Sequence, residues 1–153
     1  MPSGNWTWLV FVCCTILCWG AYAPLLHKGQ QGFDNNAWKA IFCVGMAYFV
    51  LAVLIPPIIL KADGSSFDFP ARGTVYASIA GALGAIGAMC IAGAIRTGGS
   101  PVFFMPLVFG FAPVVNVIVA SLLHKPDKAP NPLLYVGILL LGAGAWMVLR
   151  YKP

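Results

Sequence analysis

The sequence is poor in charged residues and contains no glutamate at all. Only 8% of its 153 residues are charged, whereas a soluble domain carries about a quarter. Small soluble domains also expose a large fraction of their residues to water. Because 60% of the residues are hydrophobic, the chain has too little polar surface to cover itself. These shortages exclude an ordinary water-soluble domain and predict that lipid surrounds the chain.

The sequence also lacks the groups that catalysis and metal binding need. No Asp or Glu lies within a long apolar run, and His27 and His124 stand at the ends of such runs. We therefore expect no acid–base pair for an enzyme and no antiport driven by a buried carboxylate. Cys14 and Cys18 share a helical face and could hold a soft metal, but two thiols alone make a weak site. We expect no catalytic residue, no cofactor and no metal.

Five long apolar stretches fill most of the chain, separated by charged residues and turn formers. About 20 apolar residues in a helix span the hydrocarbon layer of roughly 30 Å. The sequence therefore predicts an all-α integral membrane protein, a bundle of five transmembrane helices in one domain covering residues 1–153. The predicted helices lie near 6–27, 38–60, 73–95, 101–123 and 132–150. The segments 28–36, 61–72, 97–101 and 124–132 are expected to connect them, since they are rich in Gly, Asn, Asp, Ser and Pro.

The nine cations stand singly at the edges of the apolar runs, which is typical of membrane-flanking anchors. Nucleic-acid binding would need them clustered, so we expect none. With five spans, one side of the membrane collects four cations (Lys61, Arg72, Lys125, Lys128). The other side collects five (Lys28, Lys39, Arg96, Arg150, Lys152). A difference of one does not fix the orientation, and the chain could insert both ways.

The first apolar run has two interpretations. Ala21-Tyr22-Ala23 resembles a signal-peptide cleavage site, but no Lys or Arg precedes the run. Trp6 and Trp8 are typical of interfacial anchors of a retained helix. We expect a retained helix in a multi-pass protein of the plasma (inner) membrane.

The segment 73–95 is dense in small residues. In lipid, helices associate through close backbone contact, so small residues four apart predict a packing face. The predicted packing residues are Ala77, Gly81, Gly84, Ala85 and Ala88. This face could serve packing alone, or it could also line a cavity.

Prolines and a few polar side chains interrupt the apolar runs. Pro24, Pro56, Pro57, Pro106 and Pro113 each remove a backbone donor, which gives either a static kink or a break near a substrate site. An amide at membrane depth, such as that of Asn116, needs a partner. That partner is either a neighbouring helix or a substrate.

Two blocks of the sequence resemble a known family. The stretch at residues 19–28, WGAYAPLLHK, resembles the first-helix signature of the EamA branch of the drug/metabolite transporter superfamily. The block that begins AIRTGGSPVFF resembles that family's fourth and fifth helices, with Pro113 inside helix four. Gly137 would open helix five, and Gly142-Ala143 or Gly144-Ala145 would close it. The family commonly has a Glu after helix four, where this chain has His124-Lys125.

The resemblance implies a transporter, and it also implies a partner. Family members usually carry two five-helix units in inverted orientation, whereas this chain has one unit and no internal repeat. In inverted-repeat transporters the substrate site lies between the halves. The resemblance therefore implies a homodimer, antiparallel if both orientations occur, or a complex with another half-size chain.

Together these features predict a transporter of a small organic solute or metabolite. Its path would be lined by Trp19, Tyr22, Pro24, Pro113 and Asn116. The alternative is a non-transporting membrane scaffold or accessory subunit, held by the small-residue face.

Overall fold

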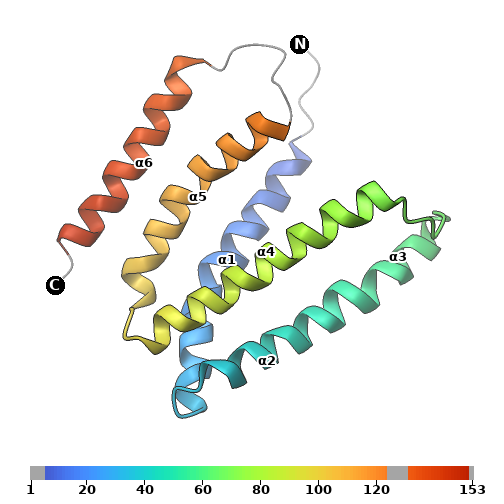
Figure 1. Ribbon diagram of the computed structural model, residues 1–153, viewed down its shortest axis with the longest axis horizontal. Helices are drawn as coiled ribbons and strands as arrows, with labels where there is room; N and C mark the ends of the chain where they lie inside the picture. Colours follow the sequence, from blue (N-terminus) through green and yellow to red (C-terminus); the bar gives the residue numbers. More distant parts are fainter. Residues whose placement is uncertain (1–5, 124–130, 152–153) are drawn as a thin grey trace. The chain divides into compact units, whose positions relative to one another are not determined.

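The computed structural model describes residues 6–123 and 131–151, and all the regular structure in that part of the chain is helical (Figure 1). The helices are α1 (Thr7–Gly32), α2 (Ala37–Tyr48), the π-helix η1 (Phe49–Leu54), α3 (Ile55–Ala62), α4 (Ala71–Arg96), α5 (Pro101–Leu123) and α6 (Pro132–Arg150). Helices α2, η1 and α3 run on as one span, Ala37–Ala62. Within the described residues, five helices are therefore long and apolar enough to cross a membrane.

Helix α1 is longer than the sequence predicted. Its end was expected near residue 27, with residues 28–36 as a connector, but the helix continues to Gly32. The turn is confined to residues 33–36, where Asp34 and Asn35 adopt positive φ values of 53° and 59°. Asp and Asn tolerate this left-handed conformation better than most residues. The expectation for residues 28–32 was wrong, because the helix continues through Gln30, whose buried side chain bonds to Ala92 on α4.

Helix α2 begins at a side-chain cap. The Oδ1 atom of Asn36 accepts hydrogen bonds from the backbone N–H groups of Trp38 (3.0 Å) and Lys39 (3.2 Å). The first turn of a helix has no intrahelical partners for these donors, so the cap stabilises the start of α2.

The middle of the second span is a six-residue π-helix rather than an α-helix. It ends two residues before the pair Pro56 and Pro57. A proline has no N–H, and its ring clashes with the carbonyl four residues earlier in an α-helix. A wider π turn removes that clash, so the proline pair predicted to interrupt this helix does so by changing its winding.

The chain forms two compact units, Met1–Gly98 and Gly99–Pro153. In the first unit α4 contacts both α1 and α2, which also contact each other. The buried residues here include many small side chains, which let the helix backbones approach closely. They are Ala23, Leu26, Gln30, Ala37, Ala40, Ala88, Ile91, Ala92 and Ile95.

In the second unit α5 packs along α6. The closest approach is at Gly110, where an added Cβ would lie 3.0 Å from the Cβ of Ala145 and 3.3 Å from the carbonyl oxygen of Leu141. A side chain at position 110 of α5 would therefore push against α6, and glycine avoids this contact. Asn131 caps α6 by accepting a hydrogen bond from the N–H of Leu133 (3.0 Å), and Pro132 occupies the first turn, where no N–H is needed. Most of the predicted connector 124–132 lies outside the described residues.

The outer surfaces of the helices are apolar. Large hydrophobic side chains such as Phe11, Leu17, Phe42 and Leu139 are more than two-thirds exposed. Patches of this extent are unusual on soluble monomers and are typical of surfaces covered by lipid or protein. The structure thus fits a multi-pass membrane protein, and the single five-helix bundle stays a prediction.

Candidate functional site

A groove of about 530 Å³ lies in the first unit between α1 and α2. Its walls are mostly aliphatic, with a tyrosine and two thiols as the polar side chains. The residues that shape it include Cys18, Tyr22 and Leu25 from α1, and Ala40, Cys43 and Ala47 from α2. The groove carries no charged side chain, so its chemistry suits a neutral or weakly polar molecule better than an inorganic ion.

Tyr22 is the most polar residue of this groove. Its hydroxyl is buried and has no hydrogen-bond partner among the described residues. A buried hydroxyl without a partner costs about 1–3 kcal/mol. Tyr22 is therefore the lining residue of the groove that carries an unsatisfied hydrogen-bonding group.

The ring of Tyr22 is held by a second predicted path residue. The centroids of Trp19 and Tyr22 lie 6.1 Å apart, and their planes are inclined by 42°. Tilted aromatic pairs at this distance are favourable. The structure thus brings two of the predicted path residues into contact on α1, although Trp19 itself remains 44% exposed.

Pro24 lies inside α1, two residues beyond Tyr22. Because proline has no N–H, the carbonyl of Gly20 loses its α-helical donor. Pro24 thus frees a backbone acceptor at Gly20, two residues before Tyr22 in the same helix.

Pro113 and Asn116 belong to the second unit, on α5. Pro113 is partly buried inside the helix, and Asn116 is exposed. No described residue forms a hydrogen bond with the Asn116 side chain. Neither α5 nor α6 therefore supplies the partner that an amide at membrane depth needs.

The small-residue face of α4 divides into two parts. Ala88 is buried in the first unit, near the end of α4 that contacts α1 and α2. Ala77, Gly81, Gly84 and Ala85 are exposed. Packing at these four positions stays a prediction.

Gln30 is a buried polar residue that the sequence did not single out. It has no exposed surface, and its Nε2 donates a hydrogen bond to the backbone oxygen of Ala92 on α4 (3.1 Å). Its Oε1 is buried without a partner among the described residues. The spacing Ala23, Leu26, Gln30 is helical, and that pattern could have indicated a buried face that continues past Lys28.

The cysteines are all free thiols on exposed helix faces. The described part of the chain contains no group of three His, Cys, Asp or Glu side chains that could hold a metal ion. Within those described residues, Cys14 and Cys18 thus have no third ligand of these types beside them. Cys18 and Cys43 face the groove, which makes them useful as reporters of its occupancy.

Comparisons with protein-family models, with curated proteins and with solved structures found no match to this chain. Membership of the EamA family therefore stays a prediction from the residues quoted above.

Proposed function

We propose that this protein is a membrane transporter of a small organic solute, built on an EamA-like five-helix unit and working as a dimer. The observation that carries the proposal is the groove between α1 and α2, lined by Tyr22, whose buried hydroxyl has no partner among the described residues. Its volume of about 530 Å³ lies within the usual range for small-molecule sites, about 300–1,000 Å³. A neutral body with one hydrogen-bond acceptor would fit this lining.

The requirement for a second chain is supported by two further features. Asn116 has no partner in its own unit, and the α4 face formed by Ala77, Gly81, Gly84 and Ala85 is exposed. An amide at membrane depth is costly unless it finds a partner, and a small-residue face is the kind of surface through which helices pack closely in lipid. A second copy, antiparallel or parallel, would supply such a helix.

The test is solute flux in proteoliposomes, with a panel of neutral and weakly polar radiolabelled solutes. Tyr22→Phe should lower the flux of the transported solute about 2- to 10-fold, the range for one neutral hydrogen bond. Tyr76→Phe on α4 is the matched control, since that ring is exposed and lies outside the groove. Equal loss in both variants would contradict a role for the groove.

The thiols give a second readout of the same site. In a chain whose only cysteine is Cys43, N-ethylmaleimide should block flux, and a transported solute should slow the alkylation. In a chain that retains only Cys90, on α4 and outside the groove, neither effect should occur. Flux that is insensitive to alkylation at Cys43 would place the path elsewhere.

A second candidate function rests on the exposed face of α4. A scaffold or accessory subunit would use Ala77, Gly81, Gly84 and Ala85 to hold another membrane protein. Flux separates the two functions, because a scaffold moves no solute in pure proteoliposomes.

A further inference from the structure

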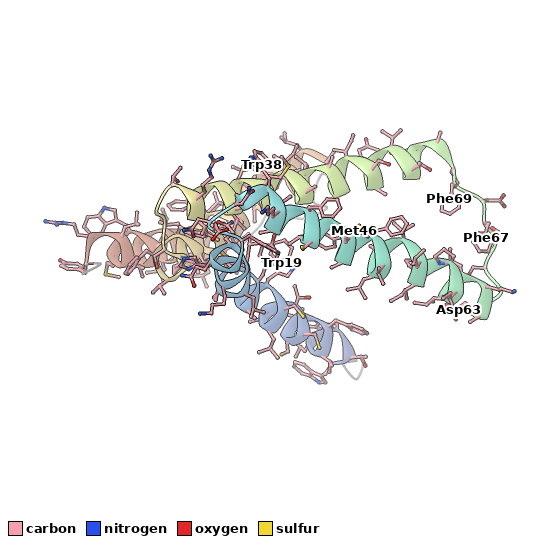
Figure 2. All side chains as sticks on the ribbon, turned by 90° about the horizontal axis from the view of Figure 1, so that it is seen from below. Trp19, Trp38, Met46, Asp63, Phe67 and Phe69 are labelled. Carbon is pink, nitrogen blue, oxygen red and sulfur yellow. The ribbon has the colours of Figure 1, made fainter. Side chains whose placement is uncertain are left out.

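The first unit has a second hollow, distinct from the groove of Tyr22. It has a volume of about 630 Å³ and lies between η1, the connector after α3 and the start of α4. Figure 2 shows the second span and α4 diverging toward this connector, with Phe69 on its inner side. The residues that matter here are Ala52 from η1, Asp68 and Phe69 from the connector, and Thr74 and Ser78 from α4.

The wall formed by η1 offers a backbone acceptor. In an α-helix the carbonyl of Ala52 would bond the N–H of residue 56, and in a π-helix that of residue 57. Both positions are proline, so neither donor exists. The carbonyl of Ala52, a residue that lines the hollow, thus lacks both of its regular helical partners.

The connector contributes a negative charge. Across the described ranges 6–123 and 131–151, no residue donates a hydrogen bond to the Asp68 carboxylate or forms an ion pair with it. No Lys, Arg or His borders the hollow. Asp68 stands two residues before Pro70, the N-cap of α4, and the helix dipole stabilises a carboxylate there. The dipole accounts for a charge at this place, but it does not replace the two helical donors that the Ala52 carbonyl lacks.

The hydroxyl of Thr74 adds to the same polarity. Its Oγ1 donates to the carbonyl oxygens of Pro70 (3.1 Å) and Phe69 (3.4 Å), so it has only lone pairs left to offer. Ser78 can accept as well. The side chains and the η1 carbonyl of this hollow therefore present acceptors and one negative charge.

We propose that this hollow binds a primary ammonium group. An ammonium carries three N–H donors and one positive charge, which matches the Asp68 carboxylate, the Ala52 carbonyl and the Thr74 hydroxyl. The Phe69 ring can contact the cation or its apolar body. The ammonium belongs either to a free amine solute or to the ethanolamine headgroup of a lipid. The site is separate from the proposed solute path.

The experiment measures binding of radiolabelled 2-phenylethylammonium to the full chain in neutral maltoside micelles by equilibrium dialysis. Asp68→Asn should weaken binding about fivefold, which is the upper end for a solvent-exposed ion pair. Asp63→Asn is the matched control, because Asp63 lies at the end of α3 and does not border the hollow (Figure 2). Its affinity should equal that of the wild type.

A second variant tests the backbone acceptor. Pro56→Ala restores an N–H at the α-helical position for the Ala52 carbonyl, and it should weaken binding about threefold, a loss of one hydrogen bond. Circular dichroism checks that each variant keeps its helical content. An unchanged affinity in both Asp68→Asn and Pro56→Ala overturns the proposal.

Two competitors complete the test. 2-Phenylethanol, which has the same body without the charge, should not displace the amine; equal displacement would show an apolar pocket only and overturn the proposal. No measurable binding of the amine to the wild type would also overturn it. Displacement by phosphatidylethanolamine but not by phosphatidylglycerol supports the ammonium site and assigns it to the lipid headgroup. Absence of that displacement supports a site for the free amine.

Discussion

Gln30 gives the sharpest test of how α1 and α4 are joined. Its buried side chain makes one hydrogen bond, from Nε2 to the Ala92 oxygen at 3.1 Å, and leaves Oε1 without a partner among the described residues. Gln30→Met loses that bond, worth about 0.5–1.5 kcal/mol, and removes an unpaired acceptor that costs about 1–3 kcal/mol. The Ala92 oxygen keeps its donor within α4, since the helix continues to Arg96. We therefore expect Gln30→Met to be neutral or to stabilise the fold by about 1 kcal/mol.

Gln30→Glu should have the opposite effect. The substitution places a second oxygen against the Ala92 carbonyl and buries a carboxyl group that must lose its charge or remain unpaired. We expect it to destabilise the fold by about 2–4 kcal/mol. The assay is unfolding in mixed micelles of maltoside and increasing dodecyl sulfate, followed by circular dichroism. Gln31→Glu is the control, because Gln31 is exposed, and it should change stability by less than about 0.5 kcal/mol.

The opposite order of stability for the two Gln30 variants would contradict this prediction. If Gln30→Met lost more than about 1 kcal/mol while Gln30→Glu matched the wild type, the Gln30 side chain would face water or headgroups rather than α4.

Three further predictions use the same unfolding assay. Gly110→Ala should destabilise the second unit by about 1–3 kcal/mol, because the new methyl lies 3.0 Å from a side chain of α6. Gly137→Ala is the control and should leave stability unchanged, because the space around Gly137 is open. Equal destabilisation by both substitutions would contradict the close α5–α6 contact. Asn36→Ala should cost about 1 kcal/mol through the lost cap of α2, and no loss would mean that water caps the helix equally well. Ala88→Leu should overpack the contacts of α4 and destabilise the fold by about 1–3 kcal/mol. Ala85→Leu should leave the monomer stable and weaken the proposed dimer in a crosslinking assay. A monomer destabilised by Ala85→Leu would place the small-residue face of α4 inside the chain.

The five long apolar helices were predictable from the sequence because their length and hydrophobicity are strong local signals. A helix must satisfy all its backbone groups within the membrane, so a long apolar run is nearly sufficient to identify it. The five helices of the structure fall on the predicted runs, and the starts of α5 and α6 match at residues 101 and 132. Near residue 28 the signal fails, because Gln30 is a polar residue whose place in α1 depends on a contact 62 residues away.

The details of the candidate site depend on tertiary contacts and were less accessible. The residues Trp19 and Tyr22 were singled out from the sequence, but the groove that Tyr22 borders forms only when α2 folds beside α1. The proline pair Pro56-Pro57 predicted an interruption without its form, since a kink and a π-helix both relieve the clash. The hollow beside Asp68 brings together residues from η1 and α4 that no local pattern connects.

The central claim is that these helices cross a membrane, and α4 tests it most directly. Its 26 residues are about 39 Å long, enough for the hydrocarbon layer of roughly 30 Å. Ser65→Cys and Ser100→Cys, each in a cysteine-free chain, place one thiol before and one after this helix. In sealed vesicles with an impermeant maleimide, a chain in one orientation should react at only one of the two sites. A chain in both orientations should react partially at each, in fractions that sum to one. Complete reaction at both sites before the vesicles are opened would show that α4 does not cross the bilayer.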